Sequence, residues 1–372
     1  MSRTRMQGLT FLAHMINDGF ELVLPTLLPL IATELSLSYL QVGVLGGCMV
    51  ISLGAGQFFT GYLSDYTGKR KMLIVGGLLC LSVSFYLMGV SQSYTQLVLW
   101  NLLAGLGASV YHPVSVSLIS NAFKQKKGKA LGIHGAGGNL GMTISPVIAG
   151  VLAHLYGWRF VFRVFPVAGI IICVLFMVLV KEEPSERRNI AVRSLFIRKI
   201  FLVILSLGFV SMASRGLTIF LPLKLSDLAY TSATFGLFLS LFNGFGIIGQ
   251  IIGGHISDIY EKPRIISVMS ILSGILMYIL LSLPQYYAMI GFVCLAGLLF
   301  NSVWPTLFGL FTDRTPEEIH GTGLGLFFSV GYIMASVAPV LMGAVTDSMS
   351  MQASFVLVPI FAFLGGLIIL KR

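Results

Sequence analysis

The chain has 372 residues, of which 56% are hydrophobic and only 10% are charged. This composition excludes a soluble globular protein, whose surface needs about 25% charged residues. The net charge of +10 could suggest a nucleic-acid partner, but the basic residues fall in short loops between long apolar stretches. We therefore expect an integral membrane protein that is surrounded by the lipid bilayer and binds no nucleic acid.

The apolar stretches indicate the number of membrane spans. A membrane-spanning helix needs about 20 apolar residues, and this chain has stretches of sufficient length for twelve. The predicted spans are residues 6–31, 40–64, 72–90, 97–121, 130–155, 160–180, 201–223, 233–257, 265–283, 288–311, 322–345 and 353–370. A connection of mixed charge, typical of a solvated linker, follows the sixth span. The sequence predicts an all-α membrane protein with six-helix halves at 1–181 and 199–372 and a cytoplasmic linker at 182–198.

The distribution of basic residues predicts the orientation. All but four of the 24 Lys and Arg residues lie at the termini or in alternate loops, and the exceptions are Arg159, Arg163, Arg215 and Lys224. Cytoplasmic loops carry the excess of basic residues. We therefore expect a multi-pass protein of the cell membrane with both termini in the cytoplasm. The first apolar stretch contains Asp18 and Glu21 and lacks a small-residue cleavage site, so it is interpreted as an uncleaved span.

An internal repeat divides the chain into two similar halves. The segment 57–71 recurs in weaker form at 250–264, and the matching residues are 193 positions apart. These matches are Gln57 with Gln250, Gly61 with Gly254, Ser64 with Ser257, and Asp65 with Asp258. A constant offset over this distance indicates a duplicated half. Six spans separate the copies, so both halves have the same orientation in the membrane.

The first copy also carries a family resemblance. Gly61-Tyr-Leu-Ser-Asp65-Tyr-Thr-Gly68-Lys69-Arg70-Lys71 resembles the signature of the loop between spans 2 and 3 of the major facilitator superfamily. More narrowly, the N-terminal half resembles the fosmidomycin-resistance-like family. The residues that carry this second resemblance are His14, Asn17, Asp18, Leu24-Pro25, Leu28-Pro29, Gly105, Gly107, Tyr111-His112-Pro113, Gly132, His134-Gly135, Gly138-Asn139, Gly141 and Pro146.

The resemblance implies two parallel six-helix repeats that rock about a central site. It also implies a gate on the cytoplasmic side, where Asp65 would meet the start of span 11 at Thr322 and Gly323. A carboxylate is stabilised at a helix N-terminus. The predicted gating motif comprises Gly61, Asp65, Gly68, Lys69, Arg70 and Asp258.

The first span holds the most informative polar residues. His14, Asn17, Asp18 and Glu21 are spaced i, i+3, i+4 and i+7, so they share one face of a helix. A charged side chain at the centre of a bilayer costs about 2.5–3.5 kcal/mol, so it is retained only where it faces a polar cavity or a partner. These residues therefore form either a structural ion pair or a site for protons or substrate.

Three residues outside the first span could complete this site. Arg215 matches Asp18 at an offset of 197, so the two could meet at the midline. Alternatively, Arg215 could bind an anionic group of the substrate through its planar guanidinium. His112 and His134 lie within spans 4 and 5, where an imidazole can relay protons or simply pack. Tyr111, Asn139, Asn301 and Trp304 complete the candidate proton-coupling and substrate set.

These features predict a secondary active transporter. We expect a proton-coupled antiporter that exports small anionic or amphiphilic compounds, with a small-molecule substrate and protons as its partners and a monomer as its working unit. A proton-coupled symporter that imports a small organic solute is the alternative, and a non-transporting receptor or assembly factor is another. No Walker, GxSxG or HExxH motif occurs in the sequence, so we expect no enzyme, cofactor or metal.

Overall fold

The computed structural model describes residues 3–123, 126–180, 198–315 and 320–370, and the regular elements in them are helices. These are α1 (Arg3–Leu35), α2 (Tyr39–Thr67), α3 (Arg70–Val90), α4 (Tyr94–Ser109), α5 (Tyr111–Ala122), α6 (Lys127–Tyr156), α7 (Trp158–Leu179), α8 (Arg198–Asp227), α9 (Ser232–Ile259), α10 (Lys262–Ser282), α11 (Tyr286–Arg314), α12 (His320–Ser348), α13 (Met351–Phe355) and α14 (Leu357–Ile368). Twelve stretches of these residues are long and apolar enough to cross a membrane. The predicted all-α fold with twelve spans is therefore confirmed.

The fourth span is divided into α4 and α5 by a proline. Pro113 has no N–H, so the carbonyl of Ser109 loses its usual helical donor. The hydroxyl of Thr60 on α2 donates to that carbonyl at 3.0 Å instead. The helix restarts at Tyr111, which places Tyr111 and His112 at the first turn of α5.

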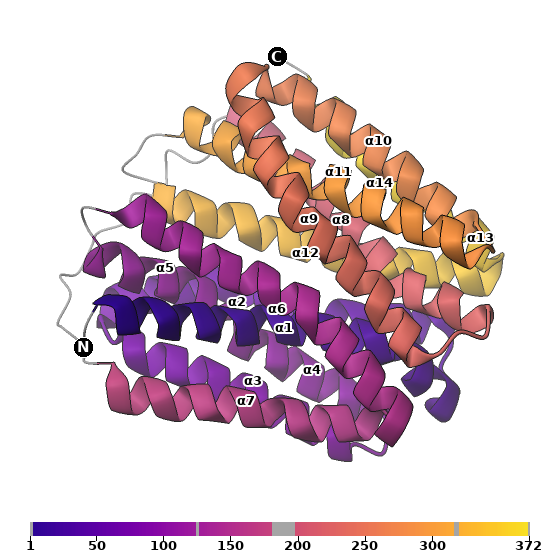
Figure 1. Ribbon diagram of the computed structural model, residues 1–372, viewed down its shortest axis with the longest axis horizontal. Coiled ribbons are helices and arrows are strands. Elements are labelled where there is room, and N and C mark those ends of the chain that lie inside the picture. Colours follow the sequence, from indigo (N-terminus) through magenta and orange to yellow (C-terminus); the bar gives the residue numbers. More distant parts are fainter. Residues whose placement is uncertain (1–2, 124–125, 181–197, 316–319, 371–372) are drawn as a thin grey trace.

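The two halves of the chain form two groups of helices (Figure 1), with α1 to α7 in one and α8 to α14 in the other. They meet mainly where α2 packs against α12 and α6 against α9. Glycine permits this close approach. A Cβ atom on Gly43 of α2 would collide with the carbonyl of Pro339, and one on Gly236 of α9 would collide with the carbonyl of Pro146.

These contacts are concentrated at one end of the bundle. We call the end where α1 begins and α14 finishes the terminal side, and the opposite end the far side. The halves converge toward the far side and diverge toward the terminal side, where the N-terminus lies (Figure 1). A Cβ atom on Gly135 of α6 or Gly254 of α9 would meet no described atom within 4 Å. The structure is therefore closed on the far side.

The carboxylate of Asp347 joins the two halves on the far side. Asp347, near the end of α12, accepts hydrogen bonds from the backbone N–H groups of Tyr39 and Leu40 at 2.9 and 2.8 Å. These residues begin α2, so the negative charge lies where the helix dipole favours it. Asp347 therefore stabilises the contact between the two halves.

The gate predicted for the terminal side is only partly described. The side chains of Asp65 and Thr322 and the linker residues 181–197 lie outside the described part of the chain. Gly68 ends α2 with a φ of 66°, a left-handed conformation that glycine adopts without strain. Arg70 is buried, whereas Lys69 and Asp258 are exposed. The gating role of this motif and the limits of the linker remain predictions.

Replacing Asp347 with Asn should weaken the closure of the far side. The change keeps the side-chain shape but removes the charge that interacts with α2, an interaction worth about 0.3–1 kcal/mol. Spin labels on the exposed far-side residues Gln92 and Met349 should report about a two- to fivefold rise in the open population. Asp313→Asn is the matched control, because Asp313 pairs with Lys262 on the terminal side. A distance distribution like that of the control would contradict this role of Asp347.

Candidate functional site

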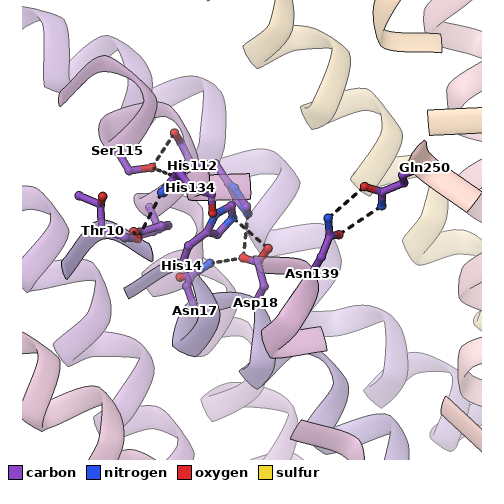
Figure 2. Close-up of polar contacts among 10 residues, drawn as sticks. Thr10, His14, Asn17, Asp18, His112, Ser115, His134, Asn139 and Gln250 are labelled. Atoms are coloured by element: carbon purple, nitrogen blue, oxygen red, sulfur yellow. Dashed lines mark hydrogen bonds and ion pairs between the residues drawn. The ribbon is translucent and has the colours of Figure 1, made fainter. Parts of the chain in front are cut away.

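Asp18 lies at the centre of a buried polar site in the N-terminal half. Its two carboxylate oxygens face two imidazoles: Oδ2 lies 3.0 Å from His14 Nε2, and Oδ1 lies 3.3 Å from His112 Nε2. Asn17 Nδ2 donates to Oδ1 at 3.0 Å. Figure 2 shows these side chains converging from α1 and α5. We call His14, Asp18, His112 and His134 the histidine–aspartate cluster.

Local structure explains how the cluster is assembled. His14 and Asp18 are four residues apart on α1 and therefore share a face. His112 reaches Asp18 because Pro113 breaks the fourth span directly beside it. On α6, Gly138 has no side chain at the point where a Cβ would contact Asp18 Oδ2 and His14 Nε2. The cluster therefore depends on a helix break and a glycine as well as on its titratable groups.

The contacts of His14 limit where its ring protons can lie. His14 Nδ1 lies 2.8 Å from the carbonyl oxygen of His134, which can only accept, so Nδ1 must donate. His14 Nε2 faces a carboxylate oxygen, and a hydrogen bond there needs a proton on one atom or the other. The contact between His14 Nε2 and Asp18 Oδ2 is therefore a hydrogen bond only when one of these two atoms carries a proton beyond that on Nδ1. The pair is a candidate site for reversible proton binding.

His134 instead has a partner within the protein for each ring nitrogen. Its Nδ1 donates to the carbonyl of Thr10 at 3.2 Å, and the hydroxyl of Ser115 lies 3.2 Å from Nε2. Its ring stacks on that of His14 with the centroids 4.1 Å apart. The hydroxyl of Tyr111 donates to the same Thr10 carbonyl at 2.7 Å. His134 and Tyr111 thus hold His14 in place.

The same side chains have a spacing that a metal ion could use. His14, Asp18 and His112 each place one ligand atom within 4.8 Å of the others. A metal would require unprotonated Nε2 atoms on both histidines. The distances from Asp18 to these atoms, 3.0 and 3.3 Å, also suit direct contacts in which the side chains share a proton, so the cluster is a candidate site for either ion.

The structure does not pair Asp18 with Arg215, and this expectation is wrong for the far-side-closed conformation. Arg215 instead donates from Nη2 to the carbonyl of Gly46 on α2 at 2.7 Å. Its acidic neighbour is Glu21, one turn beyond Asp18 on α1. The physical reason is that His14 and His112, in the same half as Asp18, already occupy its two oxygens.

The remaining predicted site residues lie apart from the cluster. Asn139 forms two hydrogen bonds with Gln250 of the other half, at 3.0 and 3.2 Å (Figure 2). Asn301 bonds to the carbonyl of Gly297 within its own helix. Trp304 is half-buried with its ring 6.4 Å from that of Phe300. Asn139 therefore joins the halves, whereas Asn301 and Trp304 have packing roles in this conformation.

Sequence reasoning missed the residues that support the cluster. Ser115 and Thr10 bond to His134, and neither is unusual in a membrane span. Asp347 was also missed, although a lone carboxylate at the end of a span is a signal that could have been followed. The partner of Asn139, Gln250, was visible only as the repeat copy of Gln57.

The fold and the site together define a multi-pass membrane transporter. Twelve spans in two groups, with a buried histidine–aspartate cluster beside their interface, are the architecture of secondary transporters. The family model described as Major Facilitator Superfamily matches residues 10–224 and 203–372. The chain therefore belongs to the major facilitator superfamily, whose members transport small molecules and are not enzymes.

Individual relatives support this assignment. The chain is 23% identical to a cis,cis-muconate transport protein of Acinetobacter baylyi, over 96% of this chain and 91% of the relative. It is 24% identical to the fosmidomycin resistance protein of Escherichia coli, over 97% and 91% of the two chains. The predicted family resemblance is thus confirmed.

A solved structure has the same fold. It is that of a bacterial homologue of the human lysosomal transporter Spinster, in an inward-facing and occupied conformation. The alignment has a TM-score of 0.88 and 16% identity, and it covers 99% of this chain and 96% of the other.

Adding one methyl group at Gly138 should disrupt the histidine–aspartate cluster. Gly138→Ala should displace Asp18 from His14 and abolish transport, because the new Cβ would occupy the space of their contact. Alanine favours a helix by up to about 1 kcal/mol over glycine, so unfolding is not expected from propensity. Transport by proteoliposomes and thermal stability should be measured together.

Gly135→Ala is the matched control for this change. It lies one turn earlier on α6, where a Cβ would meet no described atom within 4 Å, and it should retain transport. Equal activity of the two variants would show that the Asp18 to His14 contact is dispensable.

Proposed function

We propose that this protein is a proton-coupled antiporter that exports small anionic or amphiphilic compounds from the cell. The observation that carries the proposal is the buried contact between His14 Nε2 and Asp18 Oδ2, where a hydrogen bond would need a proton shared by the two groups. Proton binding and release at this site would bias the two halves between inward-facing and outward-facing arrangements.

The coupling would pass from the cluster to the interface through α6. Gly138 packs against Asp18 and His14, and the next residue, Asn139, bonds to Gln250 of the other half. Loss of the shared proton would leave an imidazole lone pair facing a carboxylate, so the two groups would move apart. Because Gly138 packs closely against both side chains, this movement would shift α6 and strain the hydrogen bonds between Asn139 and Gln250.

His112 provides the connection to the surroundings. Its side chain is 24% exposed, whereas those of Asp18 and His14 are 11% and 10% exposed. A proton could therefore reach Asp18 through His112 without unfolding the packing around His14. His134 would keep its protein partners throughout and would not itself titrate.

Location and direction are part of this proposal. With basic loops in the cytoplasm, the terminal side faces inward and the far-side-closed structure is inward-facing. The cell membrane and cytoplasmic termini follow from the same rule. Export is supported by the name of the Escherichia coli relative. Residues 141–150 resemble the antiporter motif of the superfamily, but Ser145 and Ala149 replace two of its glycines, which weakens this second support.

A symporter for uptake is the competing function. The cis,cis-muconate transport protein is named for a small organic acid and not for resistance. The same proton site could drive uptake if substrate and proton were released together. Opposite directions of proton and substrate movement in proteoliposomes would support the antiporter, and equal directions would support the symporter.

Asp18→Asn should abolish substrate-coupled proton flux in proteoliposomes. An amide cannot accept or release the shared proton, although its shape is nearly unchanged. Exchange of substrate without a proton gradient should persist, because substrate binding does not require this carboxylate. Added chelator should have no effect if the cluster binds protons and not a metal.

Glu261→Gln serves as the control variant, since Glu261 is an exposed carboxylate that pairs with Arg264 outside the spans. It should couple like the wild type. Full coupling in Asp18→Asn would overturn the proposal, and so would loss of transport on chelation.

A further inference from the structure

Arg215 is a buried cation that finds one hydrogen-bond acceptor among the described residues. The residue is 8% exposed, and its Nη2 donates to the Gly46 carbonyl of the other half at 2.7 Å. Its Nε is buried and has no acceptor among the described residues. A guanidinium has five N–H donors in a fork that matches a carboxylate.

Glu21 is a buried acid with an oxygen that lacks a hydrogen-bond donor among the described residues, whereas Arg215 has a nitrogen that lacks an acceptor there. The residue is 6% exposed, and its Oε1 has no hydrogen-bond donor among the described residues. Glu21 and Arg215 are electrostatic neighbours, with Tyr332 of α12 beside both. Nevertheless, no ion pair within 4.0 Å joins them in the described part of the chain.

This arrangement differs from a structural salt bridge. A buried charged group without a partner is strongly unfavourable, and two opposite charges that served only stability would close on each other. Unpaired groups of this kind in a native structure need an explanation, and a ligand that binds between them is one. Such a ligand would accept from Arg215 and donate to Glu21.

We propose that Arg215 and Glu21 recognise the substrate, a small organic acid with a carboxylate for Arg215 and a hydroxyl or ammonium donor for Glu21. This inference rests on the proposed transport function and specifies its substrate class. The carboxylate binds the guanidinium fork, and the donor reaches Glu21 from the other end of the molecule.

The position of Arg215 also links binding to movement. Its bond to Gly46 crosses from α8 to α2, so it belongs to the interface between the halves. A carboxylate that draws the guanidinium toward itself weakens this bond. Substrate binding therefore loosens the interface at the same level of the bundle as the histidine–aspartate cluster, since Glu21 and Asp18 are neighbours on α1.

Binding without any proton gradient tests this inference. Purified full-length protein should be titrated with 4-hydroxybenzoate, 4-(aminomethyl)benzoate, benzoate, cis,cis-muconate and the uncharged 4-hydroxybenzamide, using thermal stabilisation as the readout. A carboxylate with a donor should bind more tightly than benzoate and cis,cis-muconate, which lack one, and the amide should not bind. The two donor-bearing acids distinguish a hydroxyl from an ammonium.

Arg215→Gln should weaken binding of the preferred acid about tenfold or more, as expected for lost hydrogen bonds to a charged group. Arg215→Lys keeps the charge without the fork and should recover part of the affinity. Glu21→Gln should reduce the preference for a donor-bearing acid. Lys224→Gln, on the same helix, should bind like the wild type.

Several results would overturn the inference. They are the absence of stabilisation by every acid, binding unchanged in Arg215→Gln, and equal binding of the acid and its amide. Proton flux does not enter this measurement, so failure here would leave the assignment of Asp18 standing. Conversely, intact binding with wild-type coupling in Asp18→Asn would refute only the coupling scheme.

Discussion

The structure depends on polar partners for the carboxylate of Asp18, which is buried within the membrane-spanning helix α1. Asp18 is buried, with 8% of its surface exposed, so its oxygens need donors within the protein. Asn17 donates to one of these oxygens, and His14 and His112 each place Nε2 within 3.3 Å of the carboxylate. The carbonyl of His134 leaves His14 only this nitrogen with which to contact Asp18. Under the proposed function, a bound proton is therefore an integral part of the site.

The same constraint connects the site to the rest of the molecule. Three helices, α1, α5 and α6, must approach closely to enclose Asp18, and Pro113 and Gly138 make this possible. On α6 the enclosing residue is followed directly by Asn139, which bonds across the interface. Adjacent residues of α6 therefore connect the cluster to the contact between the halves.

Much of the architecture could be predicted because it follows from the length of the apolar stretches and from the internal repeat. Apolar length gave twelve spans, and the repeat of Asp65 at Asp258 gave two halves in one orientation. The polar face of His14 and Asp18 was predictable because i, i+4 spacing determines what shares a helix face. Asn139 was identified as a candidate, but not as a bond between the halves.

The partners of these residues could not be predicted, because they depend on distances between helices. Repeat symmetry suggested Arg215 as the partner of Asp18, but His112 lies closer once Pro113 has broken its helix. Similarly, nothing local to Asp347 indicates that it will meet the start of α2, more than 300 positions earlier. The sequence specified the groups that need partners, and the packing of the halves decided which partners they have.

The protonation state of His14 tests the central claim most directly. Nitrogen NMR of protein labelled with 15N-histidine, with His14 assigned by a His14→Gln variant, distinguishes protonated, hydrogen-bonded and free ring nitrogens. The account predicts a protonated Nδ1, and an Nε2 that either carries a proton or accepts one from Asp18. A free Nε2 whose signal does not change in Asp18→Asn would contradict it.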